Sequence, residues 1–304
     1  MISGAREKKL DTMKKILTEK QVGDFRRDGC LFPVRVMSSG EAAQCYTGFQ
    51  SVEATCGGAL SGPVRYKPHL LITWLNSLVR HPKILDAVED IIGPNILCWA
   101  SSFFNKDAHD PSFVSWHQDS TYWGLSQPDV VTAWVAFTPS RIANGCMRVI
   151  PGTHMFDQMS HTDTDGKNNL LSRGQEVEVD VDESQALDVE LEAGEISLHH
   201  VRLIHGSPPN LSDNRRIGYA IRYIPTHIEQ LYSDEDTASL VRGEDQFHNF
   251  VPEPVPSSDM DPAALKFHAK ANAVSGQVLY RGSEKQPYFS PNGTDTAGQS
   301  SEHA

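Results

Sequence analysis

The chain has 304 residues, of which 39% are hydrophobic and 22% charged, a composition typical of a soluble globular protein. Its net charge of −12 offers no basic face to a nucleic acid or an anionic membrane, and no apolar run is long enough to span a bilayer. Five scattered cysteines without a CxxC motif, and an N-terminus without an apolar leader, predict a reduced, cytoplasmic protein.

Four segments carry the signals of helices. Capping-box pairs open the first two, a proline opens the third, and an aspartate followed by a proline opens the fourth. The third segment also places its aliphatic side chains on one face, as an amphipathic helix requires. The predicted helices cover residues 17–29, 38–58, 81–93 and 259–274, and a polar, flexible tail is predicted for residues 282–304.

From residue 95 the hydrophobic period changes to two, which indicates strands. Their loops vary in length and no helical crossover separates them. This pattern favours a mainly β fold, an antiparallel double sheet of the jelly-roll type, over a parallel α/β fold. We expect one domain over residues 1–281 with a β core at about 95–225. The predicted strands cover residues 95–104, 130–137, 146–150, 176–182, 195–200 and 216–223.

The stretch SWHQDSTYW contains a His-x-Asp pair, His117 and Asp119. Residues i and i+2 of a strand point the same way, so both side chains would enter the double sheet while Gln118 points out. Two histidines and one carboxylate on one face are the ligand set of non-haem Fe(II) oxygenases. The third ligand has to come from another strand. The candidates are His199, His200 and His205.

An arginine-containing face follows these histidines. Arg216 opens the next predicted strand, in which it shares one face with Gly218, Ala220 and Arg222, whereas Arg215 points the other way. Arginine binds a carboxylate through two parallel hydrogen bonds, and small residues between two arginines leave room for a bound dicarboxylate. This face therefore predicts a dicarboxylate site.

The position of Arg216 favours one candidate for the third ligand. His205 lies eleven residues before it, across the turn-rich stretch GSPPNLSDN. We therefore expect His205 to bind the metal, and His199 and His200 to serve in packing or in support of the ligands.

Two other segments resemble metal sites without being expected to form one. A second His-x-Asp pair, His161 and Asp163, lies in a polar stretch without periodic flanks, which predicts a loop. A calcium loop is excluded because the twelfth position from Asp163 is Gly174, where a glutamate is required. In residues 176–182 acidic side chains alternate with valines, which favours a solvated strand face over a row of metal-binding carboxylates.

The ordered set WHQD, AWVAFTPSRIANGCMRVIPGTH and HGSPPNLSDNRR resembles the phytanoyl-CoA dioxygenase family of Fe(II)/2-oxoglutarate oxygenases, over about residues 17–225. The resemblance implies a double-stranded β-helix, a cupin-like jelly roll, with the N-terminal helices packed outside. It also implies that iron binds His117, Asp119 and His205, and that the distal carboxylate of 2-oxoglutarate binds Arg216. The further co-substrate residues that it implies are Trp134, Ser207, Ser102 and Lys67.

The same resemblance implies the reaction. Fe(II) and O2 would convert 2-oxoglutarate to succinate and CO2 while an unactivated C–H bond of a small molecule is hydroxylated. Relatives that chlorinate carbon have Ala or Gly at the carboxylate position, so Asp119 favours hydroxylation. Desaturation, cyclisation and demethylation stay open as outcomes of the same chemistry. A Zn hydrolase, or a metal-binding jelly roll without oxygenase activity, is the alternative from another class.

Substrate residues are predicted from their position near the motifs. The aromatic members of this set could equally fill the core. An inward-pointing Arg222 would need an anionic partner, which favours a small molecule with a carboxylate, phosphonate or phosphate; the sequence indicates no oligomeric state. The candidates are Tyr122, Trp123, His69, Trp99, Arg148 and Arg222.

Overall fold

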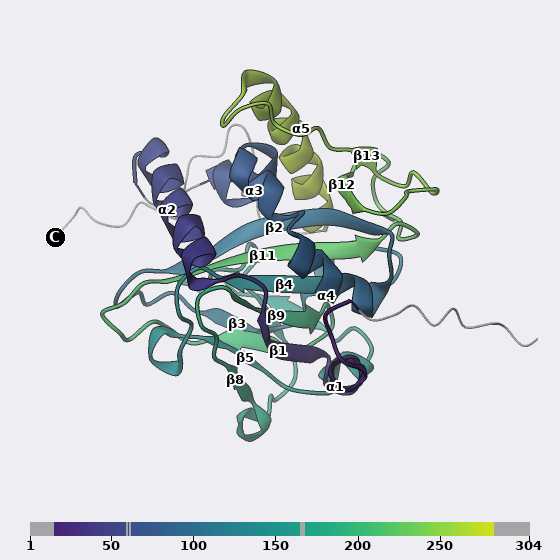
Figure 1. Cartoon of the computed structure of the whole chain (residues 1–304). Helices are drawn as coiled ribbons and strands as arrows, with labels where there is room; N and C mark the ends of the chain where they lie inside the picture. Colours follow the sequence, from purple (N-terminus) through teal and green to yellow (C-terminus); the bar gives the residue numbers. More distant parts are fainter. Residues whose placement is uncertain (1–14, 59, 61, 165–167, 283–304) are drawn as a thin grey trace, which may run out of the picture.

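The computed structural model describes residues 15–58, 60, 62–164 and 168–282. Its centre is a pair of sheets, a larger one of seven strands and a smaller one of four, and helices cover the outer face of the larger sheet (Figure 1). The strand pairs of both sheets are antiparallel apart from one short parallel pair at the edge of the larger sheet. The predicted mainly β jelly-roll fold is confirmed. The predicted tail lies, from residue 283 on, outside the described residues.

The strands come together in an order that differs from their order along the chain. The larger sheet consists, from edge to edge, of β1 (Cys30–Arg35), β9 (Glu195–His200), β4 (Val131–Ala136), β11 (Arg216–Pro225), β2 (Ile96–Lys106), β12 (Thr237–Arg242) and β13 (Val251–Pro252). The smaller sheet consists of β3 (Val114–His117), β10 (His205–Ser207), β5 (Met147–Val149) and β8 (Leu187–Val189). A separate pair is formed by β6 (His161–Asp163) and β7 (Gln175–Val177).

The four predicted helices begin within three residues of the predicted positions, and the structure adds one short helix, α3 (Thr73–Leu78), that the sequence pattern did not predict. Thr18 and Ser38 each form a capping box, and Asp261 accepts hydrogen bonds from the first turn of the C-terminal helix. The α-helices are α1 (Glu19–Asp28), α2 (Ser39–Thr55), α3 (Thr73–Leu78), α4 (Pro82–Ile92) and α5 (Pro262–Leu279). The 3-10 turns are η1 (Gly62–Arg65), η2 (Pro68–Leu70), η3 (Asp119–Tyr122), η4 (Ile142–Asn144), η5 (Thr153–Met155) and η6 (Glu183–Gln185). No helix in the described part of the chain is both long and apolar enough to cross a membrane.

The alternation of β11 and β4 separates two cores. One face of each strand packs against the helices, where Phe49 of α2 and Leu75 of α3 meet Tyr219 and Val135. The other face looks toward the smaller sheet, where Trp134 and other side chains meet Met147 and Val149 of β5. The predicted dicarboxylate face of β11 therefore lies between the two sheets.

Three predictions about individual segments are wrong. Residues 161–163 form strand β6 instead of a loop, because they pair with β7. The predicted strand 176–182 ends at Val177, and Val179 is 46% exposed, so the acidic residues beyond it lie in a turn region. The β core also extends beyond 95–225: β1 and β12 join the larger sheet. β1 is an edge strand and contains Pro33, whose missing N–H interrupts the strand's hydrogen-bond pattern. The register of its pairing with β9 shifts there, between Leu31 and Val34.

Candidate active site

Two histidine rings meet at the inner face of the smaller sheet. His117 ends β3 and His205 begins β10, and the two residues are direct partners in this antiparallel pair. Their ring centroids are 4.2 Å apart. Each Nδ1 lies close to the backbone oxygen of the residue two positions earlier in the chain, at 2.9 Å from Ser115 and 3.0 Å from Leu203. With Nδ1–H donating to the main chain, each Nε2 is free to coordinate a metal.

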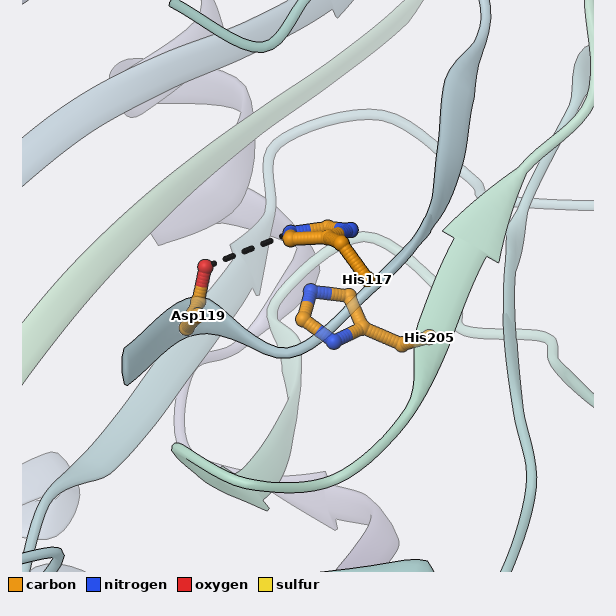
Figure 2. A group of neighbouring side chains, drawn as sticks. All are labelled: His117, Asp119 and His205. Carbon is orange, nitrogen blue, oxygen red and sulfur yellow. Dashed lines mark ion pairs between the residues drawn. The ribbon is translucent and has the colours of Figure 1, made fainter. Parts of the chain in front are cut away.

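Asp119 completes the group from just beyond the end of β3. Extended backbone continues through Gln118, and Asp119 begins the turn η3, where its N–H donates to the oxygen of Val201 at 3.0 Å. Its Oδ1 lies 3.3 Å from Nε2 of His117, a pair that the dashed line in Figure 2 marks. Burial by itself raises the pKa of the Asp119 carboxyl. Its hydrogen bond with His117 and its electrostatic interactions with His205 and Arg222 outweigh burial and hold that pKa well below its ordinary value.

The donor set fits a divalent metal ion. One ligand atom from each of His117, Asp119 and His205 lies within 4.8 Å of the others, and all three residues are buried. Burial lowers the pKa of His205 to about 4, so its ring is neutral at pH 7 and can act as a ligand. Two imidazoles and one carboxylate on one side of a cavity match the facial set of non-haem iron sites. Within the described residues this is the one such cluster of histidine, cysteine and carboxylate groups.

Gln118, the residue between the two ligands of this stretch, is fully buried. Its backbone N–H donates to Nε2 of His161 at 2.9 Å, and its side chain donates to the oxygen of Arg202 and accepts from Gln158. Asp163 accepts hydrogen bonds from two other side chains, the guanidinium of Arg173 and the hydroxyl of Tyr122 at 3.0 Å. The second His-x-Asp pair therefore packs against the first and holds the chain between the ligands. Sequence alone gives no signal for this contact.

A cavity of about 450 Å³ opens from the three ligands between the two sheets. Arg216 lies in it, buried, with its guanidinium 5.5 Å from the centre of the Trp134 ring and 3.4 Å from Ser207 Oγ. Gly218 leaves space for the indole of Trp134 rather than for a ligand, because a Cβ there would lie 1.8 Å from the ring. Arg215 is directed elsewhere and pairs with Glu53 and Asp107.

The walls of this cavity carry polar atoms without a hydrogen-bond partner in the described structure. They belong to three adjacent strands of the larger sheet: Thr132 Oγ1 on β4, His199 Nδ1 on β9, and the Nε atoms of Arg216 and Arg222 on β11. Each would cost free energy if it stayed unpaired away from water. Two buried arginines and a hydroxyl suit a ligand with carboxylate groups.

A second cavity of about 910 Å³ adjoins the first, and Asp119 and Arg222 line both. The predicted substrate residues Trp99, Tyr122 and Trp123 line its wall, and the two indoles are 5.0 Å apart. The C-terminal part of α5 closes another side. Four of the six predicted substrate residues therefore line this one cavity: Trp99, Tyr122, Trp123 and Arg222.

The other two predicted substrate residues are engaged elsewhere. His69 is fully buried behind the wall and contacts Ser101 at 2.6 Å and Glu253 at 3.1 Å. Arg148 pairs with Glu183 and Asp188.

The predicted co-substrate residues also divide. Ser207 and Trp134 line the cavity of Arg216. Ser102 accepts a hydrogen bond from Arg222. Lys67 lines the second cavity, and its ammonium is bound by Thr237 and Glu253.

The remaining two histidine candidates lie on opposite sides of β9. His199 lines the first cavity, with its ring 5.1 Å from that of His205, and burial lowers its pKa to about 3. His200 faces away and packs against His154 at 5.3 Å.

Comparisons with known proteins agree with this geometry. The family model of phytanoyl-CoA dioxygenase (PhyH) matches residues 64–218, a range that includes all three candidate ligands and Arg216. A probable alpha-ketoglutarate-dependent hypophosphite dioxygenase of Stutzerimonas stutzeri is 34% identical over 161 residues, 50% of this chain and 55% of that protein. The chain spans about half the length of the curated relatives that it matches.

Solved structures extend the similarity over most of the described chain. The apo form of ThoJ, a non-heme monooxygenase, is 36% identical, covers 85% of this chain and 97% of its own, and superposes with a TM-score of 0.77. CytC3 with Fe(II) and alpha-ketoglutarate is 26% identical, covers 80% of this chain and 100% of its own, and has a TM-score of 0.58. The family model covers half of the sequence and the motifs that carry it converge on one buried metal-ligand cluster, so the chain belongs to the phytanoyl-CoA dioxygenase family.

Proposed function

We propose that this chain is an Fe(II)- and 2-oxoglutarate-dependent oxygenase that hydroxylates an unactivated C–H bond of a small molecule. One observation carries the proposal. The buried group His117, Asp119 and His205 opens into the same cavity as Arg216, a buried cation without a carboxylate partner among the described residues. A metal ion would bind the three ligand side chains, and a dicarboxylate would pair with Arg216.

Each residue of the first cavity has a role in this proposal. His117, Asp119 and His205 hold the iron, and Arg216 and Ser207 bind the distal carboxylate of 2-oxoglutarate, with Trp134 packed beside Arg216. Bound iron supplies the redox chemistry that couples O2 and 2-oxoglutarate to oxidation of the substrate, with succinate and CO2 as co-products. The protein orients the two ligands and keeps water out, since all of these side chains are buried.

The second cavity is the proposed substrate site. It meets the first at Asp119 and Arg222, so a small molecule held between Trp99, Tyr122 and Trp123 would lie beside the metal. Asp119 supports hydroxylation, because a carboxylate at this position occupies the site that a halide would need. Product mass separates hydroxylation from desaturation, cyclisation and demethylation, because hydroxylation adds an oxygen atom to the substrate and the other three outcomes remove atoms from it.

An anionic substrate is part of the proposal. Arg222 is 9% exposed, donates to Ser102 Oγ and lies over the rings of Phe104 and Trp123, and it forms no ion pair among the described residues. A carboxylate of either the substrate or the co-substrate would pair with it. Arg222→Gln separates the two sources when 2-oxoglutarate binding is measured without substrate. Weaker binding would show that Arg222 pairs with the co-substrate, and unchanged binding would show that it pairs with the substrate.

Two predicted co-substrate residues receive less support. Ser102 reaches the cavity only through Arg222, and Lys67 is bound to Glu253 outside the cavity of Arg216. Their roles stay predictions. We also propose that residues 1–281 form one oxygenase domain, because β1 near one end and β12 near the other hydrogen-bond within the same sheet.

An anaerobic titration with Fe(II) and 2-oxoglutarate tests the proposal. The chelate of the two gives a weak visible charge-transfer band, which we expect in the wild type and not in His205→Ala. His200→Ala is the matched control, because His200 lies on the other side of β9 and should leave the band intact. A folded wild-type protein that gives no band would overturn the proposal. A band in wild type, followed by succinate and a product 16 mass units heavier than the substrate, would establish it.

A further inference from the structure

Lys106 is a fully buried lysine next to the proposed co-substrate site. It ends β2, where its direct partner on β11 is Arg216. Its Nζ donates to three oxygens: Ser207 Oγ, the backbone oxygen of Ser207 at 3.2 Å, and the backbone oxygen of Pro208. All three ammonium hydrogens are therefore used, and no carboxylate lies within 4.0 Å of Nζ among the described residues.

These contacts determine what the hydroxyl of Ser207 can do. Its oxygen accepts from Lys106 and, at 3.4 Å, from Nη1 of Arg216. A serine oxygen has two acceptor positions and one hydrogen to donate. With both acceptor positions used, the hydrogen of Ser207 is directed away from Lys106 and Arg216, toward the backbone oxygen of Gly145 at 3.4 Å. This contact is long and the Ser207 side chain lines the cavity, so an oxygen of a bound carboxylate can replace Gly145 as the acceptor.

We propose that Lys106 is a positioning residue for the distal carboxylate of the co-substrate, acting through Ser207; this inference rests on the proposed function. Lys106 does not itself line the cavity. It fixes the side chain of Ser207, directs its hydroxyl to act as a donor, and adds a second positive charge beside Arg216 once a carboxylate is bound.

The charge balance of the site supports this role. Lys106 and Arg216 are both buried, and burial together with the charge of Arg216 lowers the pKa of Lys106 to about 6, so the charged form of Lys106 is disfavoured at pH 7 while no anion is bound. The reason is that two buried cations side by side are costly without an anion. A carboxylate bound at Arg216 and Ser207 would favour the charged form of Lys106 and offset both charges, whereas a neutral ligand would not.

A purely structural role is the competing explanation, in which Lys106 only pins the Ser207–Pro208 backbone. The two explanations differ in ligand dependence. A positioning residue for the distal carboxylate affects 2-oxoglutarate but not 2-oxobutyrate, which has the same metal-chelating groups and lacks that carboxylate. A general distortion of the cavity weakens both ligands.

The test compares Lys106→Met with wild type by anaerobic titration of the Fe(II) protein with each acid, read by the visible band. We expect the Kd for 2-oxoglutarate to rise about tenfold or more, as for loss of a charge-assisted interaction, with the Kd for 2-oxobutyrate within twofold of wild type. Under turnover the same change should appear in KM for 2-oxoglutarate and not in kcat. Lys106→Gln keeps two N–H donors for the backbone oxygens and replaces the Met variant if that one is unstable. Lys270→Met, at an exposed ion pair with Glu235, is the control.

A double-mutant cycle tests the path through Ser207. If Lys106 acts through this hydroxyl, adding Lys106→Met to Ser207→Ala should weaken 2-oxoglutarate binding by less than Lys106→Met weakens it alone. Equal weakening of both acids, full additivity, or an unchanged Kd for 2-oxoglutarate would overturn the inference. A wild-type protein without any band would instead contradict the proposed function itself, so the two failures are distinguishable.

Discussion

The two histidine rings of the candidate metal site are oriented by the main chain. Each Nδ1 contacts the backbone oxygen two residues earlier, at Ser115 or Leu203, so no other side chain is needed to choose the tautomer. Asp119 differs, because its position depends on a turn and on the buried Gln118 before it. At the scale of single residues, the carboxylate is therefore the ligand whose placement depends most on its surroundings.

Replacing that carboxylate should stop the reaction. In Asp119→Ala one of three metal ligands is lost while the fold keeps its core, so 2-oxoglutarate-dependent hydroxylation should be abolished. The hydroxylated product is measured by mass after incubation with Fe(II), 2-oxoglutarate, O2 and the substrate. A rate equal to that of wild type would mean that the iron site is misassigned.

Arg216→Ala should chiefly raise the requirement for 2-oxoglutarate. Loss of the cationic partner of a buried carboxylate costs roughly 3–5 kcal/mol, or about two to four decades in affinity. KM for 2-oxoglutarate is the measurement. Arg215→Ala is a neighbouring control, since Arg215 pairs with Glu53 and Asp107 on the other face and should leave this KM unchanged. An unchanged KM in Arg216→Ala would transfer the role to Arg222.

Strand β11 serves two purposes at once because its side chains alternate. One face contributes Ile217, Tyr219, Ile221 and Tyr223 to the core under the helices. The other face places its two arginines in the cavity, and between them Trp134 of β4 lies on Gly218. At the scale of elements, the strand pair β4–β11 fixes the spacing of the two arginines in the cavity.

Gly218→Ala should damage this strand pair. The added Cβ would lie 1.8 Å from the indole of Trp134, so the ring has to move, at a cost of roughly 1–3 kcal/mol. We expect a lower Tm and weaker 2-oxoglutarate binding together. Gly23→Ala is the control, because its Cβ would meet nothing within 4 Å and α1 should become slightly more stable. An unchanged Tm in Gly218→Ala would show that Trp134 is free to shift.

A buried polar network joins distant parts of the chain on the scale of the whole molecule. Glu253 accepts from Lys67 at 2.8 Å, lies 3.1 Å from His69, and accepts from Ser239 on β12 at 2.7 Å. His69 in turn contacts Ser101 on β2. These contacts hold the wall of the second cavity together across 186 residues of sequence.

Glu253→Gln should destabilise the protein by about 3–5 kcal/mol at pH 7, because it leaves Lys67 buried without its anion. Burial alone raises the pKa of Glu253, but Lys67 and His69 outweigh burial and hold it below its ordinary 4.5. Its stabilising contribution is therefore complete above about pH 5 and is lost as the pH falls further. Urea unfolding at pH 7 and pH 4 should show a smaller difference between variant and wild type at the lower pH. A difference that grows toward pH 4 would contradict this assignment.

Local pattern in the sequence determined the helices, the central strands and the faces of β11. Capping residues act within one turn, and strand alternation acts within one strand, so both can be read without knowing the rest of the chain. The grouping of His117, Asp119 and His205 came from motif order, and the structure brings these residues together.

Only the tertiary structure decided the contacts between segments far apart in sequence. The pairing of β6 with β7 places His161 against Gln118, and the packing of the two sheets places Lys106 against Ser207. Lys67 and His69 contact Glu253 instead of the proposed ligands. A buried polar group has to find a partner somewhere, but the sequence does not say which one. That choice follows from which chain segments pack together, and folding alone settles it.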